Sequence, residues 1–282
     1  MPLLLFEEEL SMSARQEFLN LGYNPTIIET GRSVKPAFSG TLPTSATVNP
    51  LYLPPPQAQG TSKHIGSPGS CAAWATTYGL ATFTAAQNSQ TPPSDASLQA
   101  SPAHIYIEVM KCYGATQCQG SRLGSYLDLL CQGGTPNWAT APYTPNCSTL
   151  WSSYDPNATI DTSFQIPGWA MVETSDLDSV KTVIANGGAL CYGTALNSTF
   201  IGYDGSPSPM NGPFDKIKNP DGGLVGHCML IIGYDDSQGA ILIQNSFGTD
   251  WGATWNGSGG YIWMAYDLFQ FLAQGQAQYI TS

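Results

Sequence analysis

One cysteine stands where the neighbouring residues would make a thiol nucleophilic. Cys71 precedes an alanine-rich run, residues 72–81, whose composition favours a helix. The residues that favour a bend before it are Gly66, Pro68 and Gly69. A thiol at a helix N-terminus lies at the positive end of the helix dipole, which lowers its pKa and favours the reactive thiolate. A small buried cysteine would fit the same local sequence, so the rest of the chain decides between the two interpretations.

A cysteine nucleophile needs a base, and the base needs a group that orients it. The chain has three histidines, and His227 opens an apolar stretch, residues 227–234, that predicts a strand. Asn245 follows the next predicted strand, residues 240–244, and a hairpin would return it to the side of His227. An amide oxygen that accepts from an imidazole N–H fixes the ring. Cys71, His227 and Asn245 therefore predict a thiol-based catalytic site.

The elements that must position these residues divide the chain into two halves. Helical patterns dominate the first half, and strand patterns dominate the second. We predict helices over residues 71–87, 102–111, 121–133 and 176–186, and strands over residues 189–196, 227–234, 240–244, 261–266 and 276–280. Residues 135–175 lack a sustained period and predict long loops with short strands. Without strand–helix alternation, the chain predicts an α+β fold rather than a single parallel sheet.

The N-terminal segment differs from the rest of the chain. Residues 1–45 contain one candidate amphipathic helix and a proline-punctuated extension, and they hold no core of their own. We expect a leader that is either flexible or laid along the surface of the domain formed by residues 46–282. The opening residues lack the basic region and long apolar run of a signal peptide.

Charge and hydropathy exclude several classes of partner. The formal net charge is -11, and no Lys/Arg cluster occurs. Nucleic acids and anionic membrane surfaces are therefore poor partners. No apolar run approaches the roughly 18 residues that a membrane span needs. We expect a monomer.

Cysteine usage indicates an oxidising compartment, since seven cysteines favour a disulfide framework. The odd number leaves one thiol outside the pairs, and Cys71 is the candidate. Cys191 and Cys228 lie on predicted strands that could be neighbours. Cys112 and Cys118 lack the C-x₂-C spacing of zinc sites, so we expect neither a metal nor a cofactor. We expect a secreted protein whose signal peptide lies outside this sequence.

Taken in order, these motifs resemble those of the papain-like cysteine peptidases, which include the cathepsins. The resemblance rests on Gly-Ser-Cys at residues 69–71, Gly-His at residues 226–227, and Asn-Ser-Phe-Gly-Thr-Asp-Trp-Gly at residues 245–252. It covers roughly residues 46–282. It implies two subdomains, a helical left half around Cys71 and an antiparallel β-sheet or barrel around His227, with the active site in the cleft between them.

The resemblance also implies a reaction. Cys71 would attack a peptide carbonyl, His227 would protonate the leaving amine and then activate water, and Asn245 would orient His227. The implied activity is that of a cysteine endopeptidase acting on peptides or proteins. Residues 1–45 stand where the family has its inhibitory pro-region, so the chain's own N-terminal segment is an expected inhibitor and the chain an expected zymogen.

The family's substrate-binding loop is similar to residues 117–121 of this chain. By that likeness, Gly120 and Ser121 would face the residue before the scissile bond. The residues implied for the second pocket, which would suit an apolar side chain, are Leu123, Val225 and Gly226. The likeness further implies that Cys112 or Cys118 forms the left-half disulfide, with Cys131 and Cys147 as further partners.

One departure from the family pattern bears on catalysis. The family has a glutamine six residues before the nucleophile that helps to form the oxyanion hole, and this chain has Ile65 there. Isoleucine donates no hydrogen bond, which leaves the backbone N–H of Cys71 and makes His64 a candidate second donor. Two alternatives stay open: a catalytically impaired papain-like protein that binds peptides or proteins, and another thiol acyl-transfer enzyme such as a transferase or deamidase. Phe247 replaces the tryptophan that shields the His–Asn bond.

Overall fold

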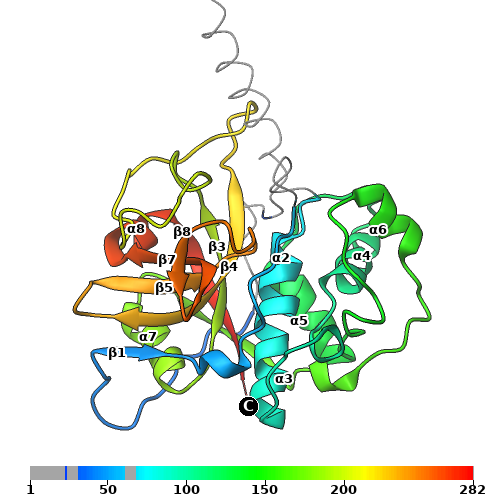
Figure 1. The fold of residues 1–282 in the computed structure, drawn as a ribbon, viewed down its shortest axis with the longest axis horizontal. Helices are drawn as coiled ribbons and strands as arrows, with labels where there is room; N and C mark the ends of the chain where they lie inside the picture. The colour runs from blue at the N-terminus through cyan, green and yellow to red at the C-terminus, as the bar shows by residue number, and fades with distance from the viewer. Residues whose placement is uncertain (1–22, 24–30, 61–67, 282) are drawn as a thin grey trace, which may run out of the picture.

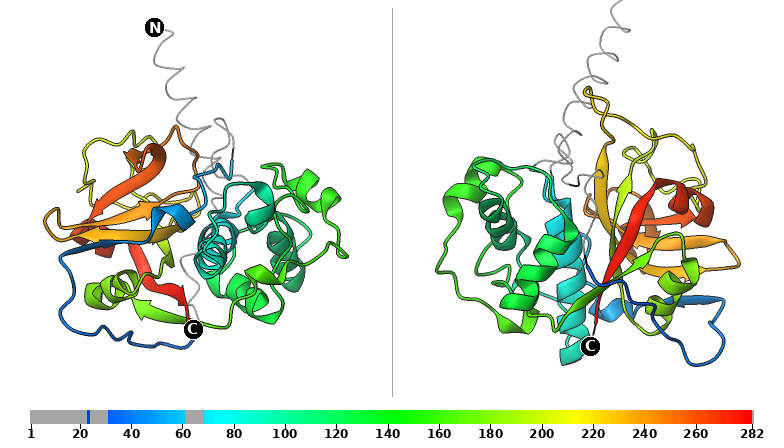
Figure 2. Two further views of the ribbon diagram at one scale, coloured as in Figure 1. Left: turned by 60° about the horizontal axis from the view of Figure 1, so that its bottom comes forward. Right: turned by 180° about the vertical axis from the view of Figure 1, so that it is seen from behind.

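In the computed structural model, which describes residue 23, residues 31–60 and residues 68–281, most helices lie on one side of the molecule. The strands lie on the other side, together with helices α7 (Leu177–Ala185) and α8 (Tyr266–Leu272) (Figure 1). The view from behind shows the same division (Figure 2). The predicted α+β fold with a helical half and an antiparallel half is confirmed. None of the helices in the described part of the chain is long and apolar enough to cross a membrane.

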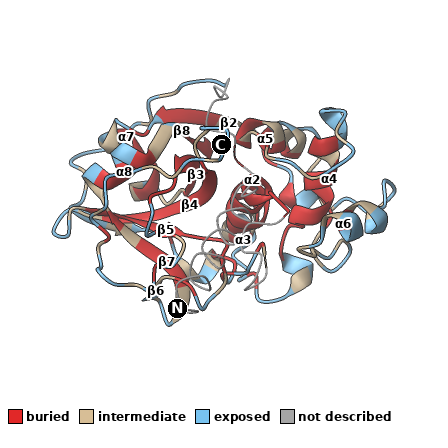
Figure 3. Ribbon diagram, turned by 90° about the horizontal axis from the view of Figure 1, so that it is seen from above, coloured by how far each residue is buried: buried red, intermediate tan, exposed pale blue. Residues whose placement is uncertain are grey.

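A long helix at the boundary of the two halves organises the structure. It is built from α2 (Cys71–Ala73), the wider π-helical turns of η3 (Trp74–Ala81) and α3 (Thr82–Ser89), and we call residues 71–89 the central helix. All residues of α2 and η3 are buried (Figure 3). Gly79 permits a close approach to the sheet, because it has no side chain and a Cβ placed on it would lie only 3.3 Å from Cδ2 of Leu230. The helix therefore packs closely onto a strand of the other half.

The helical subdomain surrounds the outer side of the central helix. Its remaining helices are α4 (Pro102–Cys112), α5 (Leu123–Gln132) and α6 (Cys147–Ser153), with 3-10 turns η4 (Ala96–Leu98) and η5 (Thr162–Phe164). Ser101 begins α4, because its Oγ accepts from the backbone N–H of His104. Asn146 begins α6 in the same way, accepting from Thr149 N–H. That cap lies inside a segment that we predicted to be loops, which is why α6 was missed.

The other subdomain is an antiparallel sheet. Its strands follow the order β2-β8-β3-β4-β5-β7-β6, and β1 pairs with β4. Their bounds are β1 (Ser45–Thr47), β2 (Trp169–Glu173), β3 (Leu190–Ala195), β4 (Gly226–Asp235), β5 (Ala240–Gln244), β6 (Ala253–Trp255), β7 (Ser258–Ala265) and β8 (Ala273–Ile280). A 3-10 turn, η2 (Pro50–Tyr52), follows β1, and α7 (Leu177–Ala185) and α8 (Tyr266–Leu272) complete this half. We did not predict β1, β6 or α8, and β2 lies in the segment for which we predicted loops with short strands.

Strand β4 separates two apolar cores. The side chains of Cys228, Leu230 and Ile232 belong to the core that contains the central helix. Those of Met229 and Ile231 belong to the core behind the sheet. This alternation follows from the period of two along a strand, and both faces of β4 are buried.

The described part of the N-terminal segment lies along the sheet. The Val34 N–H donates to the Met171 carbonyl at 3.1 Å, and Met171 N–H donates to Arg32 at 2.9 Å. Ser45 pairs with Asp235 at the start of β1, so the expected boundary between leader and domain falls inside this strand.

One disulfide is present, and it joins Cys118 to Cys147 across 29 residues of sequence. It links two of the cysteines that the family resemblance offered as partners. The expectation of a wider disulfide framework is wrong: the cysteines that are not disulfide-bonded are Cys71, Cys112, Cys131, Cys191 and Cys228. The strands of Cys191 and Cys228 are neighbours as expected, with Gly193 opposite Cys228.

Candidate active site

The nucleophile candidate lies at the start of the central helix. Gly69 has a φ of 86°, a backbone conformation that glycine adopts without strain, and it turns the chain into α2 at Cys71. The Ser70 hydroxyl does not cap this helix, and it lies 2.8 Å from the Tyr143 hydroxyl instead. The Cys71 sulfur is thus carried on the positive end of a buried helix.

His227 and Asn245 meet as the hairpin geometry predicts. His227 is the second residue of β4, and Asn245 directly follows β5, which pairs with β4. The distance between His227 Nε2 and Asn245 Oδ1 is 2.7 Å. Phe247 stacks on the imidazole at 4.8 Å between centroids, with the planes 29° apart, and covers this hydrogen bond from solvent. His227 and Asn245 are both buried.

The Cys71 thiol lies close enough to His227 for the imidazole to shift its pKa. Burial raises the pKa of Cys71, but hydrogen bonds from Cys228 and from His227, together with the charge of His227, outweigh burial and lower the pKa from 9.0 to about 6. A thiol with such a pKa is largely thiolate at neutral pH. The structure therefore brings the three predicted catalytic residues together from three separate elements.

Tyr23 occupies the space between the two subdomains. It forms one isolated β-bridge with Ser121 of the helical half and another with Gly226 at the start of β4. Its side chain is buried in the core that also contains Leu123. A Cβ placed on Gly193 would lie 2.1 Å from Cζ of Tyr23, so the ring sits where β3 has no side chain. The space above Gly193 is therefore a pocket that holds the aromatic ring of Tyr23.

Three of the residues expected to bind substrate surround Tyr23, and one packs elsewhere. Ser121 and Gly226 pair with Tyr23, and Leu123 shares its core. Ser121 Oγ lies 2.6 Å from the Tyr126 hydroxyl, and the Ser121 backbone forms the bridge to Tyr23. Gly120 directly precedes Ser121 at this edge. The side chain of Val225 packs in the core behind the sheet.

Gln59 is a buried polar residue that we did not predict. Its backbone N–H donates to the Ser246 carbonyl at 2.9 Å, and Ser246 Oγ donates to Gln59 Oε1 at 2.7 Å. The Tyr143 hydroxyl donates to the Gln59 carbonyl at 2.7 Å and contacts Ser70, the neighbour of Cys71. Gln59 is thus linked by hydrogen bonds to the neighbour of Asn245 and, through Tyr143, to the neighbour of Cys71. The signal for it was the Gln59-Gly60 pair upstream of Cys71; His64 and Ile65 lie outside the described residues.

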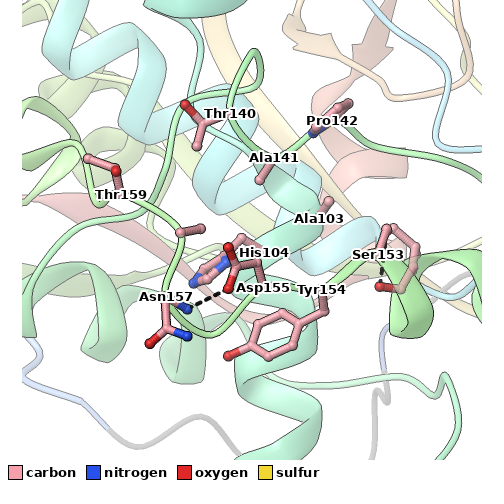
Figure 4. A pocket seen from close by; sticks show the side chains of 12 residues that line it. Ala103, His104, Thr140, Ala141, Pro142, Ser153, Tyr154, Asp155, Asn157 and Thr159 are labelled. Carbon is pink, nitrogen blue, oxygen red and sulfur yellow. Dashed lines mark hydrogen bonds between the residues drawn. The ribbon is translucent and has the colours of Figure 1, made fainter.

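Two cavities lie beside these elements. One of about 670 Å³ is lined by Gln57, Phe247 and Trp251, on the side of the His227–Asn245 pair where Phe247 lies. The other, of about 280 Å³, lies in the helical subdomain and is lined by His104 and Asp155 (Figure 4). Burial lowers the pKa of His104, which favours its neutral form. Among the residues described, no group of three or more metal-ligating side chains is close enough to hold an ion.

The sequence and the fold were compared with those of known proteins. The sequence profile of the papain family of cysteine proteases matches residues 57–277. No curated protein matches the chain. Among solved structures, xylellain, a cysteine protease from Xylella fastidiosa, is 22% identical, with 93% of this chain and 96% of that chain covered and a TM-score of 0.67. The digestive procathepsin L 3 of Tenebrio molitor larval midgut is 18% identical, with 98% and 79% covered and a TM-score of 0.66. The procathepsin B S9 of Trypanosoma congolense is 15% identical, with 95% and 88% covered and a TM-score of 0.64.

Proposed function

This chain belongs to the papain family of cysteine proteases, and from that membership we propose that it is an endopeptidase that hydrolyses peptide bonds through Cys71, His227 and Asn245. The observation that carries the proposal is the 2.7 Å hydrogen bond between His227 Nε2 and Asn245 Oδ1 beside a helix-terminal thiol of lowered pKa. A nucleophile, a base and an orienting group for that base are the parts that catalysis by a thiol requires.

The chemistry follows from the protonation states. The Cys71 thiolate adds to the substrate carbonyl, and the proton on His227 Nδ1 passes to the leaving amine. The neutral imidazole then takes a proton from water, which hydrolyses the thioester and regenerates the thiol. The Asn245 amide oxygen accepts from His227 Nε2–H throughout, so Nδ1 stays directed at the reacting atoms. Phe247 limits the access of water to this hydrogen bond.

The oxyanion of the intermediate needs hydrogen-bond donors. We propose that the backbone N–H of Cys71 and the side-chain amide of Gln59 supply them. Ser246 Oγ donates to Gln59 Oε1, which orients the amide so that Nε2 is the donor at the other end. The hydrogen bond between Ser246 N–H and Asn245 Oδ1 at 2.8 Å ties this orientation to the catalytic asparagine. On this proposal Gln59 performs the role for which the sequence offered His64, and Ile65 leaves activity intact.

The N-terminal segment is proposed as the inhibitor of a zymogen. Tyr23 is buried between Ser121 and Gly226, so its position excludes a substrate from the same place. Removal of residues 1–45 would vacate the pocket beside Gly193. The substrate residue entering that pocket is then an apolar one, with an aromatic ring preferred because Tyr23 itself fits there. The Cys118–Cys147 disulfide suits secretion into an oxidising compartment.

A peptidyl epoxide that alkylates activated thiols tests the proposal. The protein is labelled before and after its N-terminal segment is removed by limited proteolysis, and peptide-library cleavage is followed in parallel. We expect stoichiometric labelling of Cys71 after removal, its loss in His227→Ala, and its retention in the control His104→Ala, whose histidine lines a separate cavity.

Other outcomes separate the alternatives. No labelling and no cleavage would leave a peptide-binding protein without catalysis. Labelling with products whose masses show addition of an amine rather than water would identify an acyl-transferase.

A further inference from the structure

A second thiol lies against the nucleophile. Cys228 directly follows His227 on β4, and its side chain faces the core that contains the central helix. Cys71 belongs to the same core, and neither residue is more than 1% exposed. The two sulfurs are not bonded to each other.

The two cysteines are neighbours across the packing of helix on strand. Cys71 opens the central helix, Cys228 lies on the face of β4 that packs in the same core, and hydrogen bonding by Cys228 is among the causes that lower the pKa of Cys71. Packing around them fixes this approach, because Gly79 lets the central helix lie close to Leu230, two residues along β4 on the same face. A small cavity of about 20 Å³ between helix and strand is lined by Ala75, Cys228 and Leu230, which leaves room for a thiol to rotate.

We propose that Cys71 and Cys228 form a reversible redox pair that switches the enzyme off in the presence of a hydroperoxide. The proposal rests on the assignment of Cys71 as the reactive thiol. The Cys71 thiolate attacks one oxygen of the hydroperoxide, which breaks the O–O bond and gives a sulfenic acid and hydroxide, or the corresponding alkoxide. The Cys228 thiol then attacks that sulfur and releases water, leaving a Cys71–Cys228 disulfide. Two electrons pass from the thiols to the peroxide.

The pair would protect the enzyme as well as silence it. A sulfenic acid without a thiol neighbour is oxidised further to a sulfinic acid, which thiol reductants do not reverse. The disulfide stops this second oxidation, and a dithiol reductant restores both thiols. Cys191 is not expected to attack the sulfenic acid, because its thiol donates to the Gln278 carbonyl on β8, with Sγ 3.6 Å from the oxygen.

The test uses the protein after limited proteolysis has removed its N-terminal segment, because only that form is expected to react with the epoxide. It is treated with hydrogen peroxide, alkylated and digested for mass spectrometry, and epoxide labelling is measured after dithiothreitol. We expect a peptide linked through Cys71 and Cys228 and at least tenfold recovery of labelling on reduction. In Cys228→Ala, Cys71 should accumulate as sulfinic acid and labelling should not recover. Cys191→Ala, which removes another buried cysteine, should behave as the unaltered protein.

Other results overturn the proposal. These are Cys71 recovered unmodified or as sulfinic acid in the unaltered protein, Cys71 linked to a cysteine other than Cys228, and full recovery in Cys228→Ala. The linked peptide needs no variant, so poor folding of Cys228→Ala would not obscure the answer, and Cys228→Ser provides a second substitution. The linkage is read by mass, so it fails independently of the proposed peptidase activity.

Discussion

Gly193→Ala should narrow the pocket that Tyr23 occupies without disturbing the strand. The added Cβ would lie 2.1 Å from Cζ, 2.3 Å from Cε1 and 2.6 Å from the hydroxyl oxygen of Tyr23, well inside the 3.4 Å at which ordinary contact begins. The three nearest atoms all belong to Tyr23, so an aromatic ring has to withdraw by more than 1 Å.

The cost of this withdrawal can be worked from burial. A tyrosine side chain buries about 200 Å², which at about 25 cal/mol per Å² stabilises the bound ring by about 5 kcal/mol. Loss of about half of that burial costs about 2.5 kcal/mol, or about 60-fold in binding. A substrate with alanine in this pocket does not reach the new methyl group and should be unaffected.

The assay compares kcat/KM of the processed enzyme on two fluorogenic peptides that differ only in tyrosine or alanine at the second residue before the scissile bond. We expect the preference for tyrosine to fall about 60-fold in Gly193→Ala. The control is Gly133→Ala at the end of α5, where an added Cβ meets no atom within 4 Å. An unchanged tyrosine preference in Gly193→Ala would refute the assignment of this pocket. The same variant should also be inhibited more weakly by its own N-terminal segment.

Three further outcomes are expected. Gln59→Ala should lower kcat about 100- to 1000-fold with little change in KM, whereas Gln57→Ala, an exposed neighbour, should not; equal effects of the two would contradict the oxyanion assignment. Because the pKa of Cys71 is lowered to about 6, kcat/KM should fall about tenfold per pH unit below that pH and level off above it, and a midpoint near 9 would count against the thiolate. Replacing Cys118 and Cys147 by alanine should lower the free energy of unfolding by about 3–4 kcal/mol in urea titration, given a separation of 29 residues, and no change in the midpoint would show that the loop is held by other contacts.

The sequence predicted those parts of the fold and site that depend on local pattern. The strand over residues 240–244 matches β5, and the hairpin it forms with β4 brings Asn245 beside His227. Helix α4 begins one residue after Ser101, as the serine–proline pair indicated. These features are set by neighbours in the chain, so one sequence suffices to find them.

Features that depend on insertion length or on packing between distant segments escaped prediction. Counting back six residues from Cys71 leads to Ile65, whereas Gln59, which we propose as the oxyanion donor, lies twelve residues before Cys71, so the family spacing did not single it out. Strand alternation shows that Cys228 and Leu230 share a face of β4, but only tertiary packing brings the start of the central helix against that face. The partner of Cys118 likewise depends on tertiary packing, which brings its loop against the first residue of α6.

The absence of a side chain at Gly79 has a consequence for how activity can be abolished or adjusted by a distant substitution. Gly79 lies on the central helix and faces Leu230 of strand β4, in the other subdomain. A Cβ on Gly79 would come within 3.3 Å of the leucine side chain. The thiol and its base are carried by these two halves, the thiol on the helix and the base on the strand. Their alignment therefore depends on the spacing of the two halves, and a single methyl group two helical turns from the sulfur could move the nucleophile away from the base without changing any catalytic residue.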